Sequence, residues 1–185
     1  GYQTLLVCTN YDSEFETQAI RMLMAKQVDG FVLTVSDAHS SEGLTSIKGR
    51  GIPHCLLFNM APDKEQSWSV DDCSAASRVS DSFAEHGHTH VGFLALKFKS
   101  SDRARQRHQG FIDGCARNGM KLPALLEIEE DSHGLIDLLK EFLQENPTLT
   151  GIFASNDFLA LATIRSARAL GLRVPQDLSI VGFDG

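Results

Sequence analysis

Short apolar runs alternate with longer amphipathic segments along almost the whole chain. The apolar runs predict strands, at residues 3–9, 30–35, 54–58, 68–70, 90–96, 125–129, 150–155 and 178–183. Between them, apolar residues recur at helical spacing and predict helices, at about 13–27, 41–49, 72–85, 102–118 and 156–171. A further helix is expected after Ser132, carrying Leu135, Leu138, Leu139, Phe142 and Leu143. Strands that alternate with helices of this length form parallel sheets covered by helices on both faces. The pattern therefore predicts an α/β fold.

Helix-capping signals refine two of these boundaries. Ser13 and Glu16 have the spacing of a capping box at the start of the first helix, and Ser132 is a candidate cap for the helix that follows it. The first helix is expected to bury one apolar face, made of Phe15, Ala19, Met22 and Leu23.

An irregular polar stretch at residues 63–70 is the weakest point of the alternation. We take it as the boundary between two lobes, an N-terminal lobe of residues 1–70 and a C-terminal lobe of residues 71–185. The chain of 185 residues is long enough for two small lobes, each with its own core.

Charge and cysteine content narrow the function and the compartment. The formal net charge of −7 repels a phosphate backbone, so any nucleic-acid binding by the parent protein must reside in another segment. Cys8, Cys55, Cys73 and Cys115 are widely spaced, with no Cys-x-x-Cys pair. Free thiols of this kind favour a cytoplasmic location, and no run of residues is long and apolar enough to cross a membrane.

Polar side chains follow the predicted strands at their carboxyl ends, where open parallel sheets bind their ligands. Amides, hydroxyls, carboxylates and arginines of this kind exchange hydrogen bonds with polyhydroxylated or amide-bearing ligands. They are Asn10, Asp12, Ser36, Asp37, Asn59, Ser100, Ser101, Arg103, Arg105, Arg107, Asn156, Asp157 and Asp184. The same residue types also cap helices and form turns, so each position has a structural alternative.

The common catalytic patterns are missing from the sequence, and one run of histidines resembles a metal site. The chain contains no Gly-x-Ser-x-Gly elbow, no phosphate-binding loop and no dinucleotide fingerprint, so no catalytic residue, enzyme activity or cofactor is predicted. The run His86-Gly87-His88-Thr89-His90 has metal-like spacing, but its rings are expected to diverge because a helix ends and a strand begins there. The basic run 103–108 could imitate a nucleic-acid patch, although it is short and lies in an acidic chain.

Five motifs occur in the order and spacing of one known family. They are Gln27-Val28-Asp29-Gly30-Phe31-Val32, His86-Gly87-His88 before Val91-Gly92-Phe93, Arg107-His108-Gln109-Gly110-Phe111, Phe153-Ala154-Ser155-Asn156-Asp157-Phe158-Leu159-Ala160, and Val174-Pro175-Gln176-Asp177-Leu178-Ser179-Ile180-Val181-Gly182-Phe183-Asp184. The sequence resembles the effector-binding domain of LacI/GalR-type bacterial transcription regulators, and the likeness spans essentially the whole chain.

The resemblance implies a periplasmic-binding-protein-like fold, with two doubly wound parallel-sheet lobes around a cleft. A sugar, nucleobase or similar small polar effector would bind there. By position, the effector-binding residues would be Asn59, Arg103, Arg107, Asn156 and Asp184. The resemblance also implies a cytoplasmic homodimer that binds operator DNA through a helix-turn-helix absent from this chain.

Compared with that family, the chain is truncated at both ends, lacking the first strand and helix of the first lobe and the final strands of the second. Without the first strand, residues 3–9 and 30–35 would each expose an apolar edge. The two segments would then pair with each other, a neighbouring chain would fill the gap, or the first lobe would be poorly ordered.

Two rival functions remain open at this point. An exported solute-binding protein of the same fold is the first, and a signal peptide in the full gene would support it. An α/β enzyme is the second, and it would require turnover by the complete protein.

Overall fold

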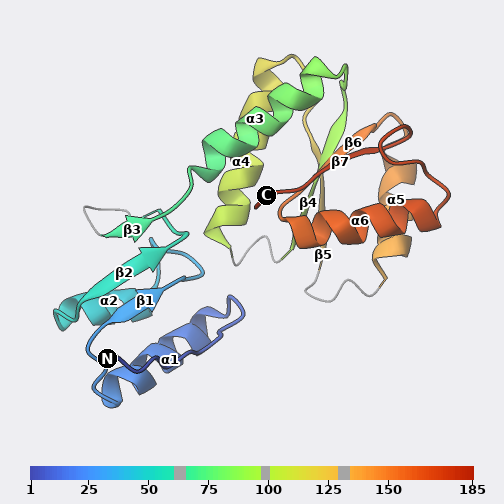
Figure 1. Ribbon diagram of the computed structural model, residues 1–185. Coiled ribbons are helices and arrows are strands. Elements are labelled where there is room, and N and C mark those ends of the chain that lie inside the picture. The colour runs from blue at the N-terminus through green and yellow to red at the C-terminus, as the bar shows by residue number, and fades with distance from the viewer. Residues whose placement is uncertain (61–65, 97–100, 129–133) are drawn as a thin grey trace. The chain divides into compact units, whose positions relative to one another are not determined.

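The computed structural model describes residues 1–60, 66–96, 101–128 and 134–185 (Figure 1). Ser100, the candidate cap Ser132 and residues 63–65 of the expected lobe boundary lie outside this part of the chain. The described residues fall into two compact units, one within Gly1–Asp71 and Lys99–Arg103, the other within Asp72–Phe98 and Ala104–Gly185. Over the described ranges, no helix has the length and apolarity needed to span a bilayer.

The second unit is built on a four-stranded parallel sheet. Its strands, in the spatial order β5–β4–β6–β7, are β5 (Ala124–Ile128), β4 (Val91–Leu96), β6 (Gly151–Ala154) and β7 (Ser179–Val181). Four helices belong to this unit: α3 (Asp72–Glu85), α4 (Asp102–Arg117, from residue 104 on), α5 (Leu135–Glu145) and α6 (Asp157–Ala169). The chain steps from β4 to β5 on one side and then to β6 on the other side of β4. The strand order therefore reverses between β4 and β6, which makes that junction the topological switch point.

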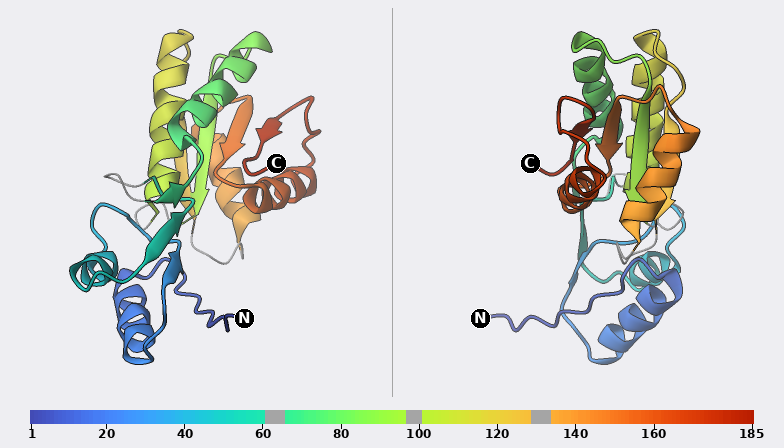
Figure 2. Two further views of the ribbon diagram at one scale, coloured as in Figure 1. Left: turned by 60° about the vertical axis from the view of Figure 1, so that its left-hand side comes forward. Right: turned by 90° about the vertical axis from the view of Figure 1, so that its right-hand side faces the viewer.

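Alternation along β4 divides the core of the second unit into two layers. Val91, Phe93 and Ala95 face a cluster that includes Phe111 of α4, while Leu94 faces a cluster with Leu139 of α5. Figure 2 (left) shows α4 and α6 on opposite sides of the strands. Both faces of the sheet are thus buried, as expected for parallel strands.

Two glycines let α3 and α4 approach closely. A Cβ added at Gly110 would lie 2.0 Å from the carbonyl oxygen of Cys73, and one added at Gly114 would lie 1.9 Å from the hydroxyl of Ser80. Only glycine leaves room for these contacts. The close approach brings the beginning of α3 beside the second turn of α4.

The first unit holds a three-stranded parallel sheet in the order β1 (Phe31–Leu33), β2 (His54–Leu57) and β3 (Ser67–Trp68). Helices α1 (Ser13–Ala25) and α2 (Glu42–Gly49) accompany it. The core consists of two small clusters, one around Leu44 and Leu56 and the other around Ile20 and Ile47.

The α/β fold class with parallel sheets is confirmed, and so are most predicted elements, but residues 3–9 do not form the predicted strand. They have no regular structure, and Tyr2 and Leu6 are exposed. A strand needs a neighbouring ladder for its backbone groups, and among the described residues these have none. Of the three alternatives given for this segment, direct pairing with residues 30–35 is not found, because residues 3–9 form no strand and the only ladder of β1 in the described residues is with β2.

Two details of α1 also differ from prediction. The helix is capped by Asp12, whose carboxylate accepts a 2.8 Å hydrogen bond from the backbone N–H of Phe15, and not by a Ser13–Glu16 box. Its buried residues are Glu16, Thr17, Ala19 and Ile20, while Phe15 and Met22 are exposed. Glu16 lies on the buried face, where its carboxylate accepts from the backbone N–H of Ser36 and the hydroxyl of Ser41.

Candidate functional site

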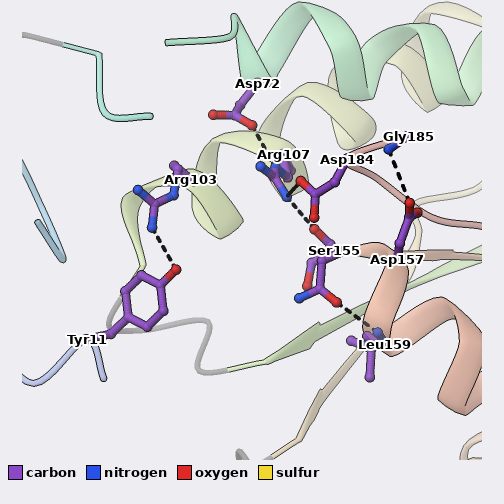
Figure 3. Close-up of polar contacts among 10 residues, drawn as sticks. Tyr11, Asp72, Arg103, Arg107, Ser155, Asp157, Leu159, Asp184 and Gly185 are labelled. Atoms are coloured by element: carbon purple, nitrogen blue, oxygen red, sulfur yellow. Dashed lines mark hydrogen bonds and ion pairs between the residues drawn. The ribbon is translucent and has the colours of Figure 1, made fainter. Parts of the chain in front are cut away.

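Arg107 lies at the centre of a polar cluster in the second unit (Figure 3). Its Nε donates a 2.6 Å hydrogen bond to Oδ1 of Asp72, and its Nη1 donates to the backbone carbonyl of Ser155. Its guanidinium carbon lies 3.7 Å from the ring centroid of Phe183, a cation–π contact. Nη1 also lies 3.7 Å from Oδ1 of Asp184. The guanidinium is therefore fixed in position from several directions.

Secondary-structure ends converge on this cluster. Asp72 is the first residue of α3, Arg107 lies in the second turn of α4, and Ser155 directly follows β6. Because β6 adjoins β4 at the reversal of strand order, the cluster occupies the switch point where parallel sheets bind ligands.

Burial differs sharply among the charged members. The side chain of Asp72 is 2% exposed and that of Arg107 is 13% exposed, whereas that of Asp184 is 60% exposed. Asp72 thus binds the arginine from the buried side, and the carboxylate of Asp184 is accessible to solvent. Within the described residues, Nη2 of Arg107 has no hydrogen-bond partner, which leaves donor capacity for a ligand.

Asn156 and Asp157 occupy the start of α6. Oδ1 of Asn156 accepts a 2.8 Å hydrogen bond from the backbone N–H of Leu159, so Asn156 is the helix cap. Its Nδ2 has no partner in the described structure and remains a possible donor. Oδ2 of Asp157 accepts from the backbone N–H of Gly185 at 3.1 Å, which ties this helix start to the segment after β7.

Asn59 lies in the first unit and is fully buried. Its Oδ1 accepts from the backbone N–H of Val35 at 2.9 Å, and its Nδ2 donates to the carbonyl of Val35 at 2.9 Å and to the carboxylate of Asp102 at 3.0 Å. The amide group thus holds the end of β1 against the start of α4, and its hydrogen-bonding groups are already occupied.

Arg103 also belongs to the first unit and is 7% exposed. Its Nη2 donates a 2.9 Å hydrogen bond to the hydroxyl of Tyr11, and its guanidinium carbon lies 5.3 Å from the Tyr11 ring centroid. Figure 3 shows the phenol directed at the guanidinium.

Two structurally important acids were not among the predicted site residues. Asp72, at the start of a predicted helix, could have been taken for a helix cap, and nothing in its local sequence indicates Arg107 as partner. Glu16 is buried and accepts from the backbone N–H of Ser36 at 2.8 Å and from the hydroxyl of Ser41 at 2.6 Å. The sequence signal that could have identified Glu16 is a glutamate next to the apolar residues of α1.

The three neighbouring histidines bind different partners. Nδ1 of His86 lies 2.8 Å from the carbonyl of Ser82, while Nδ1 of His88 and of His90 each lie 2.7 Å from a threonine hydroxyl. Burial lowers the pKa of His88 and His90, which disfavours their charged forms. Across the described residues, no group of three histidine, cysteine or acidic side chains could hold a metal ion.

The whole chain, residues 1–185, matches the family described as periplasmic binding proteins and sugar binding domain of LacI family. The chain belongs to this family. The LacI-type resemblance inferred from the five motifs is thereby confirmed. The family consists of binding proteins and regulators, in agreement with the prediction that the chain is not an enzyme.

Curated relatives of this LacI-family domain are transcription regulators. The chain is 29% identical over 188 residues to the HTH-type transcriptional regulator GntR of Escherichia coli K12. It is 30% identical over 190 residues to the HTH-type transcriptional regulator DegA of Bacillus subtilis, and 26% identical over 191 residues to the transcriptional repressor PurR of Pasteurella multocida. Each match covers 100% of this chain and 56% of the relative, so the chain spans about half the length of these proteins.

Solved structures of LacI-family regulators share the fold. A transcription regulator GntR from Chromobacterium violaceum superposes with a TM-score of 0.87 at 24% identity, covering 98% of this chain and 67% of that one. A LacI family regulator from Silicibacter pomeroyi gives a TM-score of 0.85 at 21% identity, covering 98% and 68%. The predicted periplasmic-binding-protein-like fold is therefore confirmed.

Proposed function

We propose that this chain is the effector-sensing part of a LacI-type DNA-binding transcription regulator. Its ligand would be a small polar metabolite, sugar-like or nucleobase-like, held in the cleft expected between the lobes. The observation that carries the proposal is the fixed guanidinium of Arg107 at the switch point of the second sheet, beside the exposed carboxylate of Asp184.

The donor and acceptor pattern of this cluster supports a polar ligand. Arg107 offers N–H donors through Nη2, Asn156 offers its amide nitrogen, and Asp184 offers carboxylate acceptors. Hydroxyl groups and heterocyclic nitrogens exchange hydrogen bonds with this mixture. Phe183, stacked against Arg107, adds apolar surface next to the polar groups.

Arg103 and Asn59 contribute from the first unit in different ways. Arg103 is proposed as a direct ligand contact because it retains donor capacity at Nη1. Asn59 is proposed to act indirectly, because its amide already binds Val35 and Asp102. By fixing those two, it would set the position of the neighbouring Arg103 at the start of α4.

Regulation would follow from a change in the arrangement of the lobes. An effector shifts such an equilibrium only if its affinities for the two arrangements differ. Operator DNA would be bound by a helix-turn-helix elsewhere in the full protein, since the net charge of −7 makes this chain itself a poor partner for DNA. The regulator relatives support this reading over an exported solute-binding protein, and the four free cysteines are consistent with a cytoplasmic location.

We propose further that the regulator is a homodimer, with α6 contributing to the interface. Phe158 and Leu161 are exposed at helical spacing on this helix. Sedimentation of the full-length protein should give a dimer, and Leu161→Glu should shift it toward monomer. A wild-type monomer at micromolar concentration would contradict the proposal.

A thermal-shift screen of the full-length protein tests the effector function. Sugars, polyols, nucleobases and amino acids are compared in wild type, Asp184→Ala and Arg107→Ala. A ligand at about 100 times its Kd stabilises the native state by about 2.7 kcal/mol, which gives a measurable rise in Tm. Asp184 is exposed, so Asp184→Ala should fold normally and lose the rise, while replacing the exposed Arg21 on α1 should leave it intact. A hit retained in both site variants would mean that the site is elsewhere.

A further inference from the structure

Arg103 is a buried cation with an unused donor. The residue is 7% exposed, and its Nη1 is buried without a hydrogen-bond partner. Its other terminal nitrogen, Nη2, donates to the hydroxyl of Tyr11, which is a neutral group. Burying a donor without an acceptor costs free energy, because the donor loses the hydrogen bond that water would otherwise accept from it.

The charge of Arg103 is also uncompensated. Among the described residues, no carboxylate forms an ion pair with it. The nearest acid in sequence, Asp102, uses its carboxylate to accept from Nδ2 of Asn59 at 3.0 Å and from the backbone N–H of Ala38 at 3.4 Å. Tyr11 contributes only the face and hydroxyl of its ring.

Arg107 shows the opposite situation in the same helix. Its Nε lies 2.6 Å from the buried carboxylate of Asp72, and Asp184 lies 3.7 Å from its Nη1. The protein therefore neutralises Arg107 from its own side chains, while Arg103 has no such partner. An arginine that is already neutralised suits a neutral ligand oxygen, whereas an unpaired buried arginine binds an anion most strongly.

We propose that the effector carries an anionic group, a carboxylate or a phosphate, that binds Nη1 of Arg103. The ligand class is thus a polar metabolite acid or phosphate ester rather than a neutral sugar or free base. This inference rests on the proposed effector function and specifies its ligand. Tyr11 accepts from Nη2, so Nη1 is the terminal nitrogen of the guanidinium whose donors are still unused. A neutral carbonyl would satisfy the hydrogen bond and leave the charge unbalanced.

The first test uses minimal anions on the full-length protein. Inorganic phosphate and acetate are each compared with sodium chloride at equal ionic strength, in wild type and Arg103→Met. At least one anion should raise the wild-type Tm by about 2 °C or more and leave Arg103→Met unchanged. Arg103→Met should fold as well as wild type without ligand, since it removes an unpaired buried charge, and Arg21→Met, at an exposed position on α1, should keep the response. No rise, or an equal rise in Arg103→Met, would overturn the inference.

The second test uses ligands that differ only in charge. D-glucose, D-glucuronate and D-glucose 6-phosphate share a ring, and the last two distinguish a carboxylate from a phosphate; adenine and adenosine monophosphate form a second set. An anionic member should bind at least tenfold more tightly than its neutral counterpart, and Arg103→Met should remove that difference. Another outcome is a neutral member that binds as tightly as its anionic counterparts, through a contact that Asp184→Ala removes. That result would support the proposed function and overturn the proposal that the ligand is anionic. If no member binds while the phosphate or acetate response depends on Arg103, the proposed function loses support and the anion site stands.

Discussion

Replacing Asp72 with alanine should destabilise the protein strongly, because it removes one partner of a buried ion pair. Asp72 is 2% exposed, Arg107 is 13% exposed, and the two join at 2.6 Å. In Asp72→Ala, the guanidinium keeps the carbonyl of Ser155 and a 3.7 Å pairing with Asp184, which is 60% exposed. The carbonyl of Ser155 is neutral and the carboxylate of Asp184 is exposed, so neither replaces the buried negative charge of Asp72.

Breaking one side of a buried ion pair costs about 3–5 kcal/mol. Because Asp184 still offers partial compensation, we expect a loss near the lower limit, about 3 kcal/mol. For a chain of this size each kcal/mol corresponds to roughly 2–4 °C, so Tm should fall by about 6–12 °C. Thermal and urea denaturation measure the loss. The double variant Asp72→Ala, Arg107→Met should recover part of it, because no unpaired charge remains.

A second ion pair of the same length serves as a matched control. Arg117 and Asp81 also join at 2.6 Å, but their side chains are 55% and 40% exposed. Water screens such a pair, so Asp81→Ala should change Tm far less than Asp72→Ala. Equal changes in the two variants would refute the argument that burial makes the Asp72 pair important.

Three further predictions concern packing and titration in the second unit. Gly110→Ala places a Cβ 2.0 Å from a backbone carbonyl of α3 and should cost about 1–3 kcal/mol in urea denaturation, whereas Gly49→Ala, which meets nothing within 4 Å, should be tolerated. Burial lowers the pKa of His108 below its ordinary 6.5, so the unfolded chain binds the proton at higher pH than the folded one. Stability should therefore fall as pH drops below about 6.5, and His108→Leu should weaken that dependence of Tm on pH; an unchanged slope would contradict it. Burial raises the pKa of the Cys115 thiol to about 11, so mass spectrometry of the native protein treated with iodoacetamide should find the exposed Cys8 labelled and Cys115 unlabelled until unfolding.

The hydrophobic pattern predicted most of the secondary structure because burial on the two faces of a parallel sheet imposes it. The predicted helix 72–85 coincides with α3, and the other helices and the strands from residue 30 onward agree to within a few residues. Residues 3–9 show the limit of this reasoning. Their sequence suits a strand, but strand formation depends on a partner ladder that a local pattern does not encode.

The candidate site was predictable in its residue types and its location, but not in its pairings. Strand ends and the family motifs pointed to Arg107, Asn156 and Asp184, which lie around the switch point. The pairing of Arg107 with Asp72 depends on the close approach of α3 and α4, which is a tertiary contact. Asn59 likewise has neighbours from separate segments, which sequence spacing does not reveal.

Arg107 and Asp184 are proposed to form part of the effector site of a LacI-type regulator. Isothermal titration of the full-length protein with the screened effector tests this proposal most directly, in wild type, Asp184→Asn and the control Asp137→Asn, which changes an exposed acid on α5. A hydrogen bond to a charged group contributes about 1.5–3 kcal/mol, so Asp184→Asn should weaken binding roughly 10- to 100-fold while Asp137→Asn does not. Equal affinity in all three proteins would contradict the placement of the effector at this site.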